Sequence, residues 1–129
     1  MQEELLQLFP PPAPNAARLA LARLYLQHPL HRLTEETAPL VYTNFVASLD
    51  GRIALPRPGR ASHGVPPAIG NSRDWRLYQE LAAQADIIIT SARYFRQYAR
   101  GEAQDHLPIG PGERFADLHQ WRSDNGLGA

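Results

Sequence analysis

The sequence predicts an α/β fold in which helices cover a mostly parallel sheet. The apolar run Val41–Val46 contains the β-branched and aromatic residues that strands favour. Residues 72–84 place apolar side chains at helical spacing, and Ile87–Thr90 is a continuous β-branched run typical of a strand buried on both faces. A strand, a crossover helix and a second strand in this order form a right-handed βαβ unit.

Length and composition indicate one ordinary globular domain. The chain has 129 residues, of which 43% are hydrophobic. Its 13 basic residues are all arginine and balance 13 acidic residues. This balance disfavours bulk attraction to nucleic acid or to an anionic membrane. The absence of cysteine excludes disulfides, thiolate catalysis and cysteine-based zinc sites.

No feature of the sequence indicates export or membrane insertion. No apolar run approaches the roughly 18 residues that a membrane helix needs. The N-terminus reads Met1-Gln2-Glu3-Glu4, which is acidic where a signal peptide would be basic. We therefore expect a cytoplasmic protein.

The first 38 residues are predicted to be a helical extension and a linker. An apolar cluster is followed by the proline-rich segment Pro10–Pro14, which forms a semi-rigid spacer. Asn15 is a suitable N-cap, and apolar residues at helical spacing predict a helix over 16–27 that Pro29 ends. The apolar cluster consists of Leu5, Leu6, Leu8 and Phe9.

His28 and His31 have a spacing that resembles a metal site. They flank Pro29, however, and no third ligand lies nearby in the sequence. We therefore expect no metal at this position.

The run that begins at Val41 carries polar residues toward its end. Asn44, Ser48 and Asp50 precede Gly51, and Asp-Gly is a strong turn signal. Ligands of open α/β sheets bind outside the carboxyl ends of the strands, which favours a ligand site at this position. The alternative is an ordinary strand and turn without a ligand.

This stretch resembles the opening strand of the reductase domain in the bacterial riboflavin-biosynthesis deaminase/reductase family. The resemblance implies a dihydrofolate-reductase-like, three-layer αβα fold. It also implies NADPH-dependent reduction of 5-amino-6-(5-phosphoribosylamino)uracil to the ribityl product. The matching residues are Asn44, Ala47, Ser48, Asp50, Gly51, Arg52, Ile53 and Ala54.

The resemblance also implies roles for individual residues. Asn44, Ser48 and Asp50 would hold the pyrimidine substrate, and Asp50 is the candidate for acid-base assistance. Arg93 could meet the 2′-phosphate of NADPH or lie in solvent. The residues that would approach the cofactor are Ala47, Gly51, Ile53, Ser91 and Tyr94.

Other positions match the family less well. The sequence of the proline-rich loop over residues 55–67 differs from the motif that the family has there. Gly59 and Ser62 in the loop, and Ile69 just after it, are the residues that could still match that motif. His63 in that loop is expected to be exposed. Ser91 and Tyr94 stand where the family has Gly-x-x-Thr, at the start of a predicted helix that runs to Tyr98.

The resemblance covers residues 39–110, roughly the first half of the family's reductase domain. We therefore predict an extension over 1–38, followed over 39–129 by a reductase half that is incomplete at its C-terminus. Residues 113–122 are expected to form an amphipathic helix with Phe115, Leu118 and Trp121 on one face. Two alternatives stay open: a dihydrofolate-reductase-like oxidoreductase of another substrate, and a non-catalytic fragment that binds nucleotide or pairs with another chain. The expected partner is a small pyrimidine, not nucleic acid or a membrane, with a homodimer as a candidate assembly.

Overall fold

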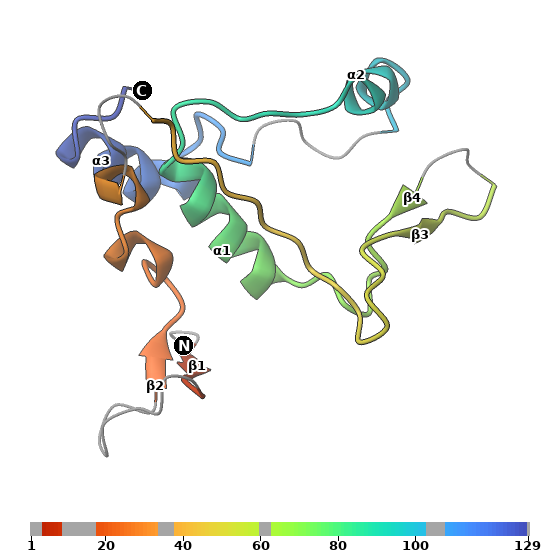
Figure 1. Cartoon of the computed structure of the whole chain (residues 1–129), viewed down its shortest axis with the longest axis horizontal. Helices are drawn as coiled ribbons and strands as arrows, with labels where there is room; N and C mark the ends of the chain where they lie inside the picture. The colour runs from red at the N-terminus through yellow and green to blue at the C-terminus, as the bar shows by residue number, and fades with distance from the viewer. Residues whose placement is uncertain (1–3, 9–17, 34–37, 60–62, 103–107, 129) are drawn as a thin grey trace.

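In the computed structural model, the central element is helix α1 (Ser72–Ala83), around which shorter strands and helices are arranged (Figure 1). The structure describes residues 4–8, 18–33, 38–59, 63–102 and 108–128. The chain combines helices with strands, as predicted. The other elements of this described part are β1 (Glu4–Leu6), β2 (Arg18–Ala20), η1 (Tyr25–Gln27), η2 (Leu30–Leu33), β3 (Leu55–Pro56), β4 (His63–Gly64), α2 (Ala92–Ala99), η3 (Glu113–Phe115) and α3 (Ala116–Asp124).

Helix α1 begins at Ser72, where the predicted helical spacing of apolar side chains also begins. The Asn71 side chain accepts hydrogen bonds from the backbone N–H groups of Arg73 (3.0 Å) and Asp74 (3.1 Å), which would otherwise have no partner in the first turn. The Asp74 carboxylate lies in that turn, where the helix dipole favours negative charge. The predictions of α1, of α2 and of the helix near the C-terminus are confirmed.

The core lies where α1, η1 and α3 meet. The predicted apolar face of the C-terminal helix is confirmed, because Phe115, Leu118 and Trp121 are all buried. Arg122 Nη1 donates to the carbonyls of Ala83 (2.8 Å) and Ala85 (2.9 Å), which satisfies acceptors at the end of α1. The core cluster consists of Leu26, Ala83, Phe115, Leu118 and Trp121.

A buried carboxylate attaches the segment 18–33 to α1. Glu80 is fully buried and accepts hydrogen bonds from the backbone N–H groups of Arg23 (2.5 Å) and Tyr25 (2.9 Å) and from Arg76 Nε (2.9 Å). One helical turn further on, Gln84 accepts from the Leu30 N–H (2.7 Å) and donates to the Tyr25 carbonyl (3.0 Å). Glu80 on α1 and Gln84 just after its end therefore bond backbone groups of residues 23–30 that a helix in this segment would have bonded within itself.

The predicted helix over 16–27 is wrong over its described part, residues 18–27. These residues form strand β2, a turn and the single 3-10 turn η1. Arg23 at the turn has φ = 69°, a left-handed conformation that no α-helix contains. The bonds to Glu80 override the helical spacing of the apolar side chains. Phe9, Pro10–Pro14, Asn15 and Ser62 lie outside the described residues.

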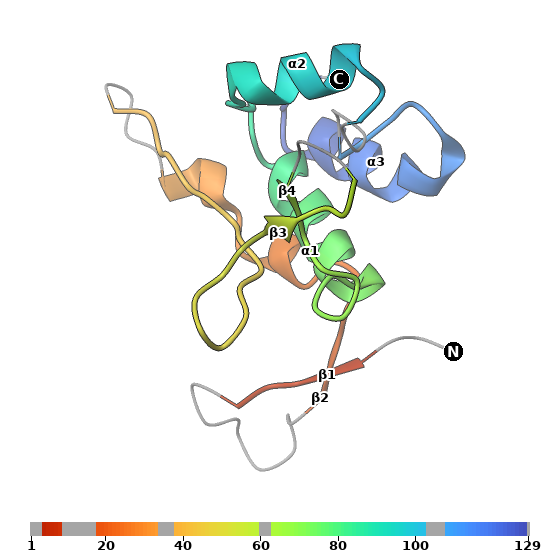
Figure 2. The same ribbon diagram turned by 90° about the vertical axis from the view of Figure 1, so that its right-hand side faces the viewer.

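The predicted parallel sheet is also wrong for the part of the chain that the structure describes. Its two sheets are antiparallel hairpins, β1 with β2 and β3 with β4. The hairpin β3–β4 occupies the loop predicted over 55–67. Seen from the side, the β1–β2 hairpin lies at the opposite end of the molecule from α2 (Figure 2).

The two segments expected to form parallel strands, Val41–Val46 and Ile87–Thr90, are not strands in the structure, and they diverge from each other. Both pass the C-terminal end of α1, and from there Val41–Leu49 runs toward β3 while Ile87–Thr90 runs toward α2 (Figure 1). Tyr42 Oη donates to the Leu81 carbonyl (2.7 Å), which attaches the first segment to α1. Burial, with a smaller contribution from Asp86, raises the pKa of Tyr42 and keeps the phenol a neutral donor. None of the helices in the described ranges is long and apolar enough to cross a membrane.

The buried Glu80 generates a stability prediction. Glu80→Gln removes one carboxylate acceptor from a fully buried group while Arg76 stays paired with Asp117, and it should lower the free energy of unfolding by about 1–3 kcal/mol. The control Glu4→Gln breaks an exposed ion pair with Arg18 and should cost less than about 1 kcal/mol. Urea unfolding measures both changes, and equal effects would contradict the role given to Glu80.

A second prediction concerns acid. The Arg76 guanidinium donates hydrogen bonds to both carboxylate oxygens of Asp117, and these bonds hold the pKa of the Asp117 carboxyl below its ordinary value of 3.8. The stabilisation from this pair is therefore complete above pH 3.8 and is lost as the pH falls below 3.8 toward the folded-state value. In Asp117→Asn this part of the acid-dependent loss should disappear, while Ser123→Ala, an exposed change on the same helix, should keep it. Urea midpoints measured across acidic pH check the difference.

Candidate functional site

The Asp50 turn spans residues 48–52 and is closed by two backbone hydrogen bonds. The Ser48 N–H donates to the Arg52 carbonyl (2.9 Å), and the Gly51 N–H donates to the Ser48 carbonyl (2.8 Å). Gly51 has φ = 82°, the left-handed conformation with which such loops end. The turn predicted at Asp50-Gly51 is confirmed.

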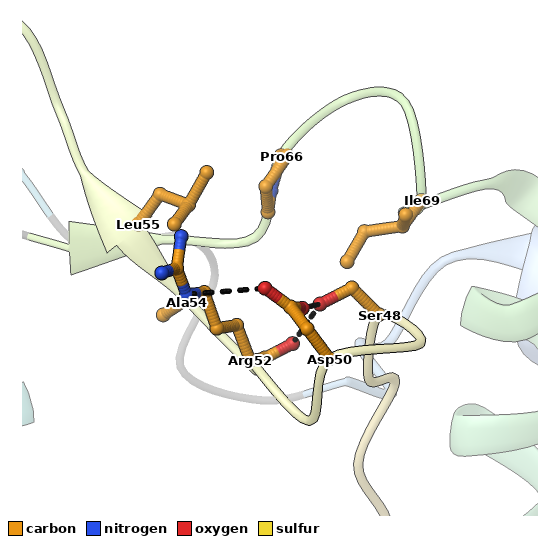
Figure 3. A pocket seen from close by; sticks show the side chains of 7 residues that line it. All are labelled: Ser48, Asp50, Arg52, Ala54, Leu55, Pro66 and Ile69. Atoms are coloured by element: carbon orange, nitrogen blue, oxygen red, sulfur yellow. Dashed lines mark hydrogen bonds and ion pairs between the residues drawn. The ribbon is translucent and has the colours of Figure 1, made fainter.

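Three polar side chains converge at this turn. Ser48 Oγ lies 2.5 Å from Asp50 Oδ1 and 3.1 Å from the Arg52 carbonyl, so its one proton is shared between two acceptors. Arg52 Nε lies 3.3 Å from the other oxygen of Asp50 (Figure 3). The Arg52 and Asp50 side chains are 69% and 60% exposed, so their ion pair stabilises the fold little and can reorganise around a ligand.

These side chains form the polar end of a pocket of about 210 Å³. Pro66 and Ile69 lie across the pocket from Ser48 and Asp50 (Figure 3). The pocket is smaller than the roughly 300–1,000 Å³ of typical ligand sites, so it suits a small ring and not a dinucleotide. Its lining residues are Ser48, Asp50, Arg52, Ala54, Leu55, Pro66 and Ile69.

The structure therefore brings together two of the three residues expected to hold the substrate. Ser48 and Asp50 line the pocket, whereas Asn44 is half-buried and does not. Ala47, Gly51 and Ile53 are exposed beside the turn and do not line this pocket either.

The other two residues expected at the cofactor lie at the start of α2. Ser91 Oγ accepts a hydrogen bond from the Tyr94 N–H (3.2 Å), so this hydroxyl caps the helix. The Tyr94 ring packs edge-on against Phe95. Neither residue lines the pocket at the Asp50 turn.

Arg93 connects the start of α2 to the wall of the pocket. Arg93 Nη2 lies 2.9 Å from Nδ1 of His63, and both side chains are exposed. Because a guanidinium only donates, Nδ1 is the acceptor and the ring proton is on Nε2. His63 belongs to β4, whose next residue Gly64 pairs with the pocket residue Leu55. Arg93 thus has a protein partner in addition to its exposure to solvent, and its contact with a phosphate stays a prediction.

Sequence reasoning missed the charged partner Arg52 and the apolar walls formed by Leu55 and Pro66. A signal for Arg52 was present, because a cation two residues after Asp50 in a tight turn returns to the carboxylate. No comparable signal identified Pro66, since only the folding of the 55–67 loop brings it to the turn.

The structure gives the two histidines beside Pro29 different surroundings. His28 is exposed, whereas the ring of His31 packs edge-on against Trp121 at a centroid distance of 5.6 Å. Within the described ranges, no group of three or more histidine, aspartate or glutamate side chains is placed to hold a metal ion.

Comparisons of the chain with protein-family models, with curated protein sequences and with solved structures give no match.

The turn geometry generates a prediction for Gly51. Gly51→Ala should lower the free energy of unfolding by about 1–2 kcal/mol, because an alanine at φ = 82° is strained. The Ser48 amide, which donates across the turn, should exchange its hydrogen faster. In Gly128→Ala the added Cβ meets no atom within 4 Å, so neither property should change. Hydrogen exchange and urea unfolding make the comparison, and unaltered exchange at Ser48 in Gly51→Ala would contradict the turn.

Proposed function

We propose that this chain supplies the substrate side of an NADPH-dependent reductase of riboflavin biosynthesis, which reduces 5-amino-6-(5-phosphoribosylamino)uracil to the ribityl product. The observation that carries the proposal is the cluster of Ser48, Asp50 and Arg52 at one end of a small pocket. All three belong to the stretch that resembles the reductase family. We propose the cytoplasm as the compartment.

The pocket is chemically suited to a pyrimidine. A uracil ring presents N–H donors and carbonyl acceptors along one edge, which a carboxylate and a guanidinium can match. Asp50 would accept from a ring N–H, and Arg52 would donate to a ring carbonyl. Leu55, Pro66 and Ile69 offer apolar surface to the faces of the ring.

The cofactor side is supported less well. NADPH would supply a hydride when bound. The five residues expected to meet it do not line the pocket, and the Ser91 hydroxyl is engaged in capping α2. These residues therefore do not fit a dinucleotide bound beside the substrate in this arrangement, and the proposal rests on the substrate side alone.

A second candidate function is non-catalytic binding of a pyrimidine nucleotide. The position of the expected cofactor residues outside the pocket favours this candidate, because a chain that binds the substrate without a cofactor cannot reduce it. A reductase with a different small substrate would also use the carboxylate and guanidinium, since neither group distinguishes uracil from other rings that carry donors and acceptors.

The proposal predicts a specific loss of affinity in Asp50→Asn. Replacing a charged acceptor by an amide should weaken binding of the aminouracil substrate about tenfold or more. The matched control is Asp74→Asn, which changes a carboxylate in the first turn of α1 outside the pocket and should leave affinity unchanged. Isothermal titration calorimetry measures both, and equal affinity of Asp50→Asn and the unmodified chain would remove Asp50 from the site.

An assay of NADPH oxidation separates the candidates. Oxidation that depends on the aminouracil substrate and falls in Asp50→Asn supports the reductase. Substrate binding without oxidation supports the non-catalytic candidate. If the chain neither binds the substrate nor oxidises NADPH, both candidate functions are overturned.

A further inference from the structure

Every polar group of Ser48 makes a hydrogen bond within the Asp50 turn. Its N–H donates to the Arg52 carbonyl (2.9 Å), its carbonyl accepts from the Gly51 N–H (2.8 Å), and its hydroxyl lies 2.5 Å from Asp50 Oδ1. Because a serine hydroxyl has one proton, Ser48 cannot donate to a ligand while it donates to Asp50. This arrangement differs from the direct substrate contact that the resemblance implies for Ser48.

The Asp50 carboxylate depends on its neighbours for a fixed orientation. The side chain is 60% exposed, and an exposed side chain on a turn populates several staggered rotamers unless a partner selects one. Its two oxygens have different partners, since Oδ1 bonds Ser48 and Oδ2 pairs with Arg52 (Figure 3). These contacts select the direction in which the carboxylate faces the pocket.

Ser48 contributes more to this orientation than Arg52 does. A separation of 2.5 Å between a hydroxyl and a carboxylate oxygen is typical of a charge-assisted hydrogen bond. Arg52 Nε lies farther away, at 3.3 Å, and holding its long, 69% exposed side chain in place costs conformational entropy. The Ser48 side chain is short and half-buried, so its contact costs little entropy.

We propose that Ser48 is a positioning residue, which orients the Asp50 carboxylate toward the ligand and does not contact the ligand itself. A carboxylate that already has its bound orientation loses less conformational freedom on binding, and affinity is higher for that reason. The identity of the ligand rests on the proposed function. The orientation of Asp50 does not, because it can be measured in the free chain.

The first experiment measures the orientation of Asp50 without a ligand. Three-bond NMR couplings should show one dominant χ1 rotamer of Asp50 in the unmodified chain and in Ser48→Thr, which keeps a hydroxyl. In Ser48→Ala the couplings should average over several rotamers. Hydrogen exchange at the amide of position 48 should stay unchanged in both variants, because the backbone hydrogen bonds of the turn remain. Equal couplings in Ser48→Ala and the unmodified chain would overturn the proposal.

A double-mutant cycle asks whether Ser48 contacts the ligand. Isothermal titration calorimetry should show that Ser48→Ala weakens binding of the aminouracil substrate about twofold to tenfold, and that Ser48→Thr restores it. In a chain that already carries Asp50→Ala, the same Ser48→Ala change should have no further effect, because no carboxylate remains to be oriented.

The outcomes of the cycle separate the role of Ser48 from the proposed function. Equal losses of affinity with and without Asp50→Ala would reveal a direct contact between Ser48 and the ligand and would overturn the positioning role. If the unmodified chain binds no aminouracil, the proposed function fails, and the NMR couplings alone decide whether Ser48 orients Asp50.

Discussion

The fully buried carboxylate of Glu80 is the interaction on which the arrangement of the described chain depends. A buried charge is tolerated only when it is paired and hydrogen-bonded, and Glu80 obtains both from Arg76 and from the backbone of residues 23–25. These bonds hold η1 against α1, and η1 delivers Leu26 to the core. Arg76 also bonds Asp117 on α3, so the Glu80–Arg76 pair links the three elements that enclose the core.

This core is small, and its size explains the exposed segments. Five residues form the central cluster, and all of them lie on α1, η1, η3 or α3. The apolar runs that begin at Val41 and at Ile87 contribute no residue to this core cluster. These apolar side chains therefore remain exposed in the described part of the chain.

The candidate site is built differently from the core. Its polar end is organised by local hydrogen bonds among Ser48, Asp50 and Arg52, and its apolar walls come from the loop that contains β3 and β4. Binding residues on loops beside a rigid scaffold are common, because loops tolerate exposed polar groups. The bond between Arg93 and His63 makes α2 a further support of this loop.

The sequence by itself determined the elements whose signals are local. The Asn71 cap and apolar spacing specify α1, Ser91 specifies the start of α2, and Asp50-Gly51 specifies the turn that places Ser48 beside Asp50. Only the tertiary structure decided the rest. The buried Glu80 captured backbone donors that a helix over 18–27 would have used, the two candidate strands diverged from α1 instead of pairing, and Pro66 reached the pocket. Each of these outcomes depends on contacts between residues far apart in the chain, which local spacing does not encode.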